Sequence, residues 1–350
     1  MSHLESHLTD ATEQSNTSHQ PPLVEDSDPS DADSAYGASI NSTISASLTS
    51  SVLNYRYENG RRYHAYREGQ YYLPNDEDEQ ARLDMLHHIF CLVLDGALFR
   101  APLFQHGQPQ RVLDLGCGTG IWCMGFADEF PESLVIGIDL SPIQPDWVPP
   151  NCKFYVDDIE SEWAYSPIEH FDYIHGRALC GSIADWPRLF TQSLANLRPG
   201  GWLEMQEFYC HVYDYDGGID NAPCLKDWEV KITEASRRFG KDLKKANVLK
   251  QHMEDAGFVD VQEEIYKVPI GTWAKGRKFK ELGRYSLVQF LDSVEPFSLA
   301  LFTRVLGYTV DETKIMIAKV KSDLHNPKLH SYLHFHLVWG RKAGELGRSE

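Results

Sequence analysis

Residues 111–120, RVLDLGCGTG, decide how this chain folds. An apolar strand pattern runs directly into Gly116, Gly118 and Gly120, and a helical pattern begins at Ile121. Glycine suits a loop whose backbone must turn sharply or lie against a ligand with no side chain between. The free N–H groups at the start of the following helix attract an anion, such as a phosphate or a carboxylate. The stretch therefore predicts a strand, a ligand-binding loop and a helix in succession.

Short apolar runs alternate with helical stretches around this loop. The strand candidates are 111–115, 134–140, 153–157, 171–175 and 201–208. Helical candidates at 120–130 and 184–197 lie between them, which predicts βαβ units and a parallel sheet with right-handed crossovers. The remaining candidates are a helix at 241–256, an extended run at 258–270, a helical region at 277–325 and a strand at 331–340. Thr309 and Glu312 have the spacing of a capping box for the last helix.

The composition divides the chain into three parts. Residues 1–50 hold twelve serines and eight acidic residues but no Lys or Arg, so they cannot bury enough apolar surface to fold and are expected to be disordered. Residues 51–108 form a Tyr-rich N-terminal cap and a helix. Residues 109–345 form the sheet domain, with a helical insertion at about 277–325.

Charge and cysteine content exclude several classes of protein. The formal net charge of −18 argues against direct binding to nucleic acid, which relies on basic side chains to neutralise phosphates. No apolar run is long enough to cross a bilayer, and the N-terminus lacks a signal-peptide pattern. Seven cysteines without a C-x-x-C pair indicate a reducing compartment, so we expect the protein in the cytoplasm or nucleus and not outside the cell.

Acidic residues at the strand ends narrow the choice of ligand. Asp139 closes the second strand, where an α/β fold places a carboxylate on ribose hydroxyls. Asp114 lies inside the first strand, where it suits a ligand amino group better than a pyrophosphate. Asp158 and Ile159 end the third strand and could hold an adenine amino group and ring. A nucleoside joined to an amino acid meets these conditions, and S-adenosyl-L-methionine is such a ligand.

These motifs resemble those of class I S-adenosyl-L-methionine-dependent methyltransferases. LDLGCGTG resembles the family's first motif, Asp139 its ribose acid, Asp157-Asp158-Ile159 its adenine motif and LRPGGW at 197–202 its turn into the fifth strand. The resemblance implies an α/β, Rossmann-like sheet of seven strands with the last strand antiparallel. It also implies an N-terminal helical cap and a helical insertion before the last strand.

A narrower resemblance covers nearly all of residues 55–342. ENGRRYHAYREGQYYLPNDEDEQARLD, SPIQP, CGSIADWP and SLALFTRVLGY are similar to stretches of the fungal LaeA-like methyltransferases, which are regulators of secondary metabolism and development. The resemblance implies methyl transfer to a protein or regulatory target, with velvet-type regulatory proteins or a related methyltransferase as partners. Two alternatives stay open: methylation of a small-molecule metabolite at oxygen or nitrogen, and a cofactor-binding scaffold with little turnover.

The expected cofactor contacts come from the glycine loop, the strand ends and the Tyr-rich segment 55–72, which could fold over the ligand as a lid or simply pack. They are Asp114, Gly116, Cys117, Gly118, Thr119, Gly120, Asp139, Leu140, Asp157, Asp158, Ile159, His175, Arg177, Tyr63 and Tyr71. Arg62 and Arg67 are candidates for the ligand's carboxylate.

Two residues near the ends of the fourth and fifth strands are candidates for catalysis. His175 could be a base, a cofactor contact or a packed histidine, and Glu207 could receive a cationic acceptor or be a plain strand-end charge. We expect no metal, because His330, His334 and His336 are joined by no Cys or carboxylate at ligand spacing. The 277–325 region and the segment after the fifth strand should wall the acceptor site. A closed apolar pocket there would favour a metabolite, and an open acidic groove a protein.

Overall fold

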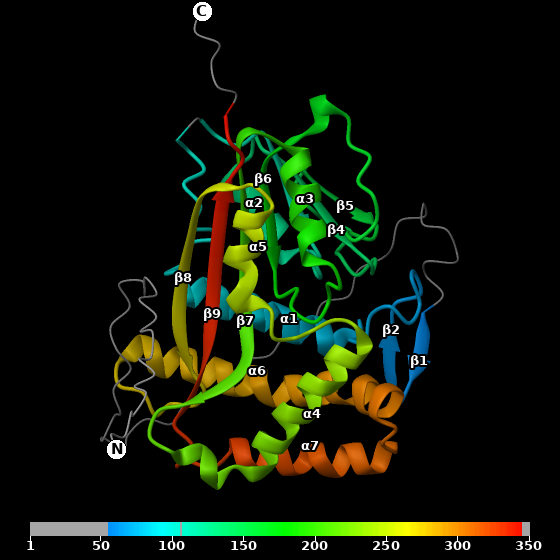
Figure 1. The fold of residues 1–350 in the computed structure, drawn as a ribbon, viewed down its shortest axis with the longest axis vertical. Helices are drawn as coiled ribbons and strands as arrows, with labels where there is room; N and C mark the ends of the chain where they lie inside the picture. The colour runs from blue at the N-terminus through cyan, green and yellow to red at the C-terminus, as the bar shows by residue number, and fades with distance from the viewer. Residues whose placement is uncertain (1–54, 106, 345–350) are drawn as a thin grey trace, which may run out of the picture.

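The computed structural model describes residues 55–105 and 107–344 (Figure 1). The predicted tail at 1–50 lies outside these residues. A seven-stranded sheet forms the centre, in the order β5-β4-β3-β6-β7-β9-β8. Its strands are β3 (Arg111–Leu115), β4 (Leu134–Asp139), β5 (Cys152–Val156), β6 (Phe171–Arg177), β7 (Leu197–Asp214), β8 (Val259–Pro269) and β9 (Ser331–Arg341). β9 runs antiparallel to both of its neighbours, β7 and β8, so the predicted topology is confirmed.

Apolar side chains on both faces of the sheet explain the helices that cover it. Val112 and Leu113 are consecutive in β3, so they point to opposite faces, and each belongs to a different apolar cluster. The Val112 cluster takes in α1 (Glu77–Val93) and α2 (Ile121–Glu129). The Leu113 cluster takes in α3 (Trp186–Asn196) and α5 (Leu249–Asp255). A parallel sheet buried on both sides in this way needs near-continuous apolar strands, which the sequence supplies.

A helical layer lies beyond one end of the sheet. Figure 1 shows α4 and α7 gathered there with α6, and α1 running between α6 and the sheet. The elements are α4 (Pro223–Phe239), α6 (Arg277–Leu301), a π-helical turn (Phe302–Leu306) and α7 (Val310–Leu324). A hairpin of β1 (Arg56–Glu58) and β2 (Arg61–Tyr63) packs with them, and short 3₁₀ turns occupy Pro167–Glu169, Gly218–Asn221 and Ala246–Val248. The predicted capping box at Thr309 and Glu312 begins α7.

Gly283 in α6 gives a stability test with an unusual sign. A Cβ at this position would lie 1.9 Å from the carbonyl oxygen of Gly271, whose own N–H donates to the Gly283 carbonyl at 2.9 Å. Alanine normally stabilises a helix over glycine by about 1 kcal/mol. Here we expect Gly283→Ala to lower the free energy of unfolding by about 3 kcal/mol, because the backbones must separate.

Gly125 in α2 is the matched control for that measurement. A Cβ there makes only an ordinary contact, 3.6 Å from a Leu98 methyl, so Gly125→Ala should be neutral or stabilising. Urea unfolding of both variants checks the pair. Equal stability of Gly283→Ala and the unsubstituted protein would contradict the close approach of α6 to residue 271.

Candidate active site

A pocket, here pocket A, lies at the carboxyl ends of the first four parallel strands, where open α/β sheets bind their ligands. It encloses about 830 Å³ of empty space, including solvent at its mouth, which is within the range of ligand pockets. The predicted residues that line it are Gly116, Gly118, Asp139, Leu140, Asp157, Asp158, Ile159, Arg177 and Tyr71.

Asp139 holds the glycine loop in shape while it faces pocket A. Its carboxylate accepts hydrogen bonds from the N–H groups of Gly118 and Ser141, both at 2.8 Å. Burial raises the pKa of Asp139 to about 6, and these two bonds oppose the rise. Each carboxylate oxygen has a second lone pair, so Asp139 retains capacity to accept from ligand hydroxyls.

The acids after β5 connect pocket A to the N-terminal segment. Asp158 accepts from the Ser161 hydroxyl at 3.3 Å, and its Oδ2 lies 3.4 Å from the Nε of Arg67. Asp157 accepts from the N–H of Asp158 at 2.8 Å. Tyr71, from the Tyr-rich segment, also lines the pocket. The segment that the sequence suggested as a lid therefore reaches the rim of pocket A through Arg67 and Tyr71.

A second pocket, pocket B, continues pocket A along the glycine loop. It holds about 400 Å³ of empty space and shares Gly116, Gly118 and Arg177 with pocket A. The predicted residues Asp114, Cys117 and Thr119 line pocket B. Pocket B thus has a carboxylate, Asp114, and a guanidinium, Arg177, in its wall. This pair of charges complements the ammonium and carboxylate groups of an amino acid.

Helix α1 forms the outer wall of both pockets, which the sequence did not reveal. Glu79 and Leu83 of α1 line pocket A, as does Asn75 just before the helix, and Leu83 also lines pocket B. The Thr119 hydroxyl in the glycine loop donates to Asp84 at 2.6 Å, which ties α1 to the loop. A helix within residues 51–108 was predicted, but no local pattern indicates that it folds over a loop 35 residues further along the chain.

The structure favours the packed histidine among the readings of His175. Its side chain is fully buried, and its ring stacks on Trp122 with centroids 3.8 Å apart. Its Nδ1 lies 2.7 Å from Asp114, the residue opposite it on β3. His175 is not among the described residues that line pockets A and B. In this arrangement it positions Asp114.

Glu207 also has a structural role. Its carboxylate is buried and accepts from the N–H groups of Leu179 at 2.7 Å and Cys180 at 3.0 Å. Burial raises the pKa of Glu207 to about 7, with the two N–H groups opposing the rise. It fixes the loop after β6, which forms one wall of pocket A, and does not receive a substrate cation.

Three further expectations for contact residues are corrected by their packing. Tyr63 is buried in the helical layer, where the Arg304 guanidinium lies 4.9 Å from its ring centroid. Gly120 faces the ring of Phe154. Arg62 is held by Asn75, to whose carbonyl it donates at 2.7 Å. Among the described residues, none of these three lines pocket A or pocket B.

Arg177 and His87 form a pair at the wall of the pockets that should respond to pH. Arg177 donates to Nδ1 of His87 at 3.0 Å. Burial, together with the Arg177 charge, lowers the pKa of His87 from 6.5 to about 3. Between these values the unfolded chain binds a proton that the folded protein does not, so stability falls as the pH falls through this window.

We therefore expect His87→Asn to reduce the acid sensitivity of the protein. Between about pH 7 and about pH 5, its loss of unfolding free energy should be smaller than that of the unsubstituted protein by about 2 kcal/mol. Urea titrations at the two pH values measure this difference. His88→Asn, at the neighbouring exposed position, is the control and should leave the loss unchanged. An identical acid response in His87→Asn would show that His87 is not the buried neutral histidine described here.

Within the described residues, no three His, Cys, Asp or Glu side chains gather as metal ligands. The three histidines of the last strand region have other partners: His336 lies 2.8 Å from Glu263, His334 stacks on Tyr213 and His330 lies 2.7 Å from Asp216. A search of the same residues for a helix long and apolar enough to cross a membrane finds none.

The two pockets fit S-adenosyl-L-methionine from end to end. Pocket A offers Asp139 to ribose hydroxyls and the Asp158 region to an adenine ring. Pocket B offers Asp114 and Arg177 to the amino-acid end. The glycine loop lies between the two, and its bare backbone leaves room for the ligand.

Comparisons with known proteins agree with this geometry. A family model described as a methyltransferase domain matches residues 85–263. Methyltransferase pytC of Aspergillus terreus is 40% identical over 297 residues, which are 85% of this chain and 90% of the relative. Secondary metabolism regulator laeA of Monascus pilosus is 37% identical over 288 residues, covering 81% of this chain and 77% of the relative. Protein-methionine methyltransferase laeA of Emericella nidulans is 36% identical over 297 residues, covering 81% and 76%. The chain belongs to the LaeA-like family of S-adenosyl-L-methionine-dependent methyltransferases.

Proposed function

We propose that this protein transfers a methyl group from S-adenosyl-L-methionine to an acceptor in fungal secondary metabolism. The observation that carries the proposal is the pair of joined pockets, one suited to a nucleoside and the other to an amino acid. The cofactor supplies an activated methyl group on a sulfonium. The residues of this chain bind and orient the two ends, and α1 and Tyr71 cover the site against water. Positioning of this kind supplies much of the rate of a displacement.

The names of the relatives support a regulatory role with a protein acceptor. Several are called secondary metabolism regulators, and one is called a protein-methionine methyltransferase. This is the acceptor class that the sequence resemblance implied. We propose, on the resemblance seen in the sequence, that the protein works in the cytoplasm or nucleus and that velvet-type regulatory proteins or a related methyltransferase are its partners.

A specific structural observation favours a small-molecule acceptor as the second candidate. An apolar pocket, here pocket C, lies between the helical layer and the sheet. Its walls include α6 and the C-terminal part of β7. These are the segments expected to form the wall of the acceptor site. An apolar pocket at this place favours a small-molecule metabolite as the methyl acceptor. The relative named methyltransferase pytC, which bears no regulator's name, is compatible with this candidate.

Tritium labelling separates the candidates. Extract of a fungal strain lacking the protein is incubated with tritiated-methyl cofactor and purified protein, and labelled protein and small molecules are then separated. Label in either fraction, absent with a Gly118→Arg variant, supports enzymatic transfer and identifies the acceptor class. No label in any fraction, although the cofactor binds, would reject turnover in favour of a scaffold.

A further inference from the structure

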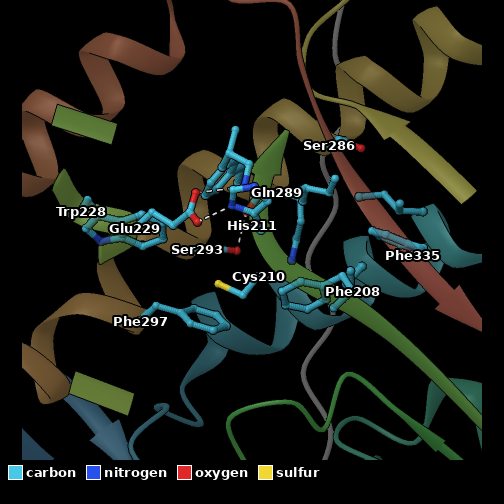
Figure 2. A pocket seen from close by; sticks show the side chains of 15 residues that line it. Phe208, Cys210, His211, Trp228, Glu229, Ser286, Gln289, Ser293, Phe297 and Phe335 are labelled. Atoms are coloured by element: carbon cyan, nitrogen blue, oxygen red, sulfur yellow. Dashed lines mark hydrogen bonds and ion pairs between the residues drawn. The ribbon is translucent and has the colours of Figure 1, made fainter. Parts of the chain in front are cut away.

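Pocket C is an apolar pocket outside pockets A and B. Figure 2 shows side chains from α1, α4, α6, β7 and β9 converging on it. Its empty volume, including solvent at its mouth, is about 640 Å³, which lies within the range of ligand pockets.

Five aromatic rings line pocket C. They are Phe208, Trp228, Phe290, Phe297 and Phe335. The one polar group among these rings, Nε1 of Trp228, already donates to the Ser298 hydroxyl at 2.8 Å. The rings therefore present carbon surfaces to the space they enclose. Such walls bind an apolar ligand with flat rings, through burial and through edge or face contacts between rings.

Ser286 places a polar group, its hydroxyl, in this apolar wall. Its side chain lines pocket C, the residue is only 5% exposed, and its hydroxyl has no hydrogen-bond partner among the described residues. A buried hydroxyl without a partner is unfavourable, so such groups in native structures usually await a water or a ligand. Ser286 can donate to, or accept from, one polar group on a bound molecule.

A second polar feature lies on the other wall. His211 Nδ1 lies 2.6 Å from Oε1 of Glu229, and both residues line pocket C (Figure 2). Lys244 and the N–H of Val212 also donate to this carboxylate. Burial opposes the charge, but the bonds from His211, Lys244 and Val212 hold the pKa of Glu229 below its usual value. An ionised Glu229 accepts the Nδ1–H of His211, which leaves Nε2 of that ring to hydrogen-bond a ligand hydroxyl.

Pocket C adjoins the cofactor site along α1. Leu86 lines both pocket B and pocket C. Arg82 bridges the same boundary, because it pairs with Glu79 in the wall of pocket A and donates to Ser293 in the wall of pocket C at 3.4 Å. Pocket C and pocket B thus meet at Leu86, where a molecule in pocket C comes nearest to the cofactor site.

We propose that pocket C is the acceptor site and that it takes an apolar small molecule with aromatic rings and a hydroxyl group. The rings bind between the aromatic side chains, and Ser286 and His211 recognise the hydroxyl. This inference rests on the proposed function and deepens it by naming the substrate class.

Calorimetry with 1-naphthol as the probe tests the proposal on the full chain. The unsubstituted protein should bind 1-naphthol about tenfold more tightly than naphthalene, which lacks the hydroxyl. Ser286→Ala should remove most of that preference while the affinity for naphthalene stays the same. Ser286→Phe, which fills the pocket, should weaken 1-naphthol about tenfold or more. Val288→Phe, at a 40% exposed position on the same helix, is the matched control and should leave the affinity unchanged.

Titration of S-adenosylhomocysteine into each variant distinguishes a failure of the pocket C proposal from a failure of the proposed function. Its affinity should be the same in all of them, because pockets A and B are untouched. A protein that binds S-adenosylhomocysteine but not 1-naphthol, or that binds 1-naphthol equally well with Ser286→Phe, would overturn pocket C as an aromatic acceptor site. Failure to bind S-adenosylhomocysteine would instead reject the proposed function.

Discussion

Gly118→Arg should abolish measurable binding of S-adenosyl-L-methionine and leave the protein folded. Gly118 lines both pocket A and pocket B, at the point where they join. A Cβ there would point toward Leu83 of α1, 3.4 Å from its nearest methyl. The long arginine side chain beyond that Cβ has only the ligand space to occupy. We expect a loss of affinity of about a hundredfold or more, since the ligand and the side chain exclude each other.

The backbone of Gly118 requires a control of its own. Its φ of +55° is in the left-handed region, where a side chain costs about 1–2 kcal/mol. Gly240→Arg carries the same kind of penalty, because φ is +91° there and nothing lies within 4 Å of the added Cβ. Equilibrium dialysis with tritiated cofactor should show normal binding by Gly240→Arg and none by Gly118→Arg. Similar affinities for the two variants would remove the glycine loop from the site.

Arg82→Met should lower the free energy of unfolding by about 3–5 kcal/mol, which is the largest loss of stability that we expect from a single substitution. Arg82 and Glu79 lie one helical turn apart in α1 and are both almost fully buried. The Arg82 guanidinium donates to both oxygens of the Glu79 carboxylate, at 2.8 and 2.5 Å. Methionine keeps the length of the side chain but leaves the Glu79 carboxylate buried without its counter-charge.

A double substitution shows whether the loss comes from the stranded charge. Replacing both residues, as Glu79→Leu with Arg82→Met, removes the unpaired carboxylate and should recover most of the lost stability. Denaturant unfolding of the two single variants and the double variant measures the coupling. If the double variant were as unstable as Arg82→Met alone, the cost would lie in lost packing and not in the unpaired charge.

The sheet and the cofactor loop were predictable because their signals are local. The glycine loop, the apolar runs on either side and Asp139 lie within about thirty residues of one another. Alternating strand and helix then leave few ways to arrange a parallel sheet. The antiparallel last strand followed from the family resemblance rather than from any pattern in its own residues.

The surroundings of His175 and Glu207 depend on where their strands end. The pattern suggested a strand ending at residue 175, but β6 continues to Arg177, so His175 lies inside the sheet beside Asp114. β7 likewise extends to Asp214, which places Glu207 within the strand and not at its end. The end of a strand is set by its pairing with strands that are distant in the sequence. The surroundings of a residue near that end, and so its chemical role, cannot be predicted without knowing this pairing.

The helical layer could be predicted only in part. The 277–325 region was recognised as helical, but α4 was not, although Trp228, Ile232 and Ala235 form an apolar face along it. That face is buried largely by contact with α6 and α7, which lie far along the chain. Pocket C arises from the same long-range packing, so no single segment of the sequence could reveal it.

A crystal structure of the protein with S-adenosylhomocysteine tests the central claim most directly. We expect the ligand to span pockets A and B, with its ribose hydroxyls on Asp139 and its amino-acid end between Asp114 and Arg177. Ligand density in another place, or a ribose that does not contact Asp139, would contradict the account.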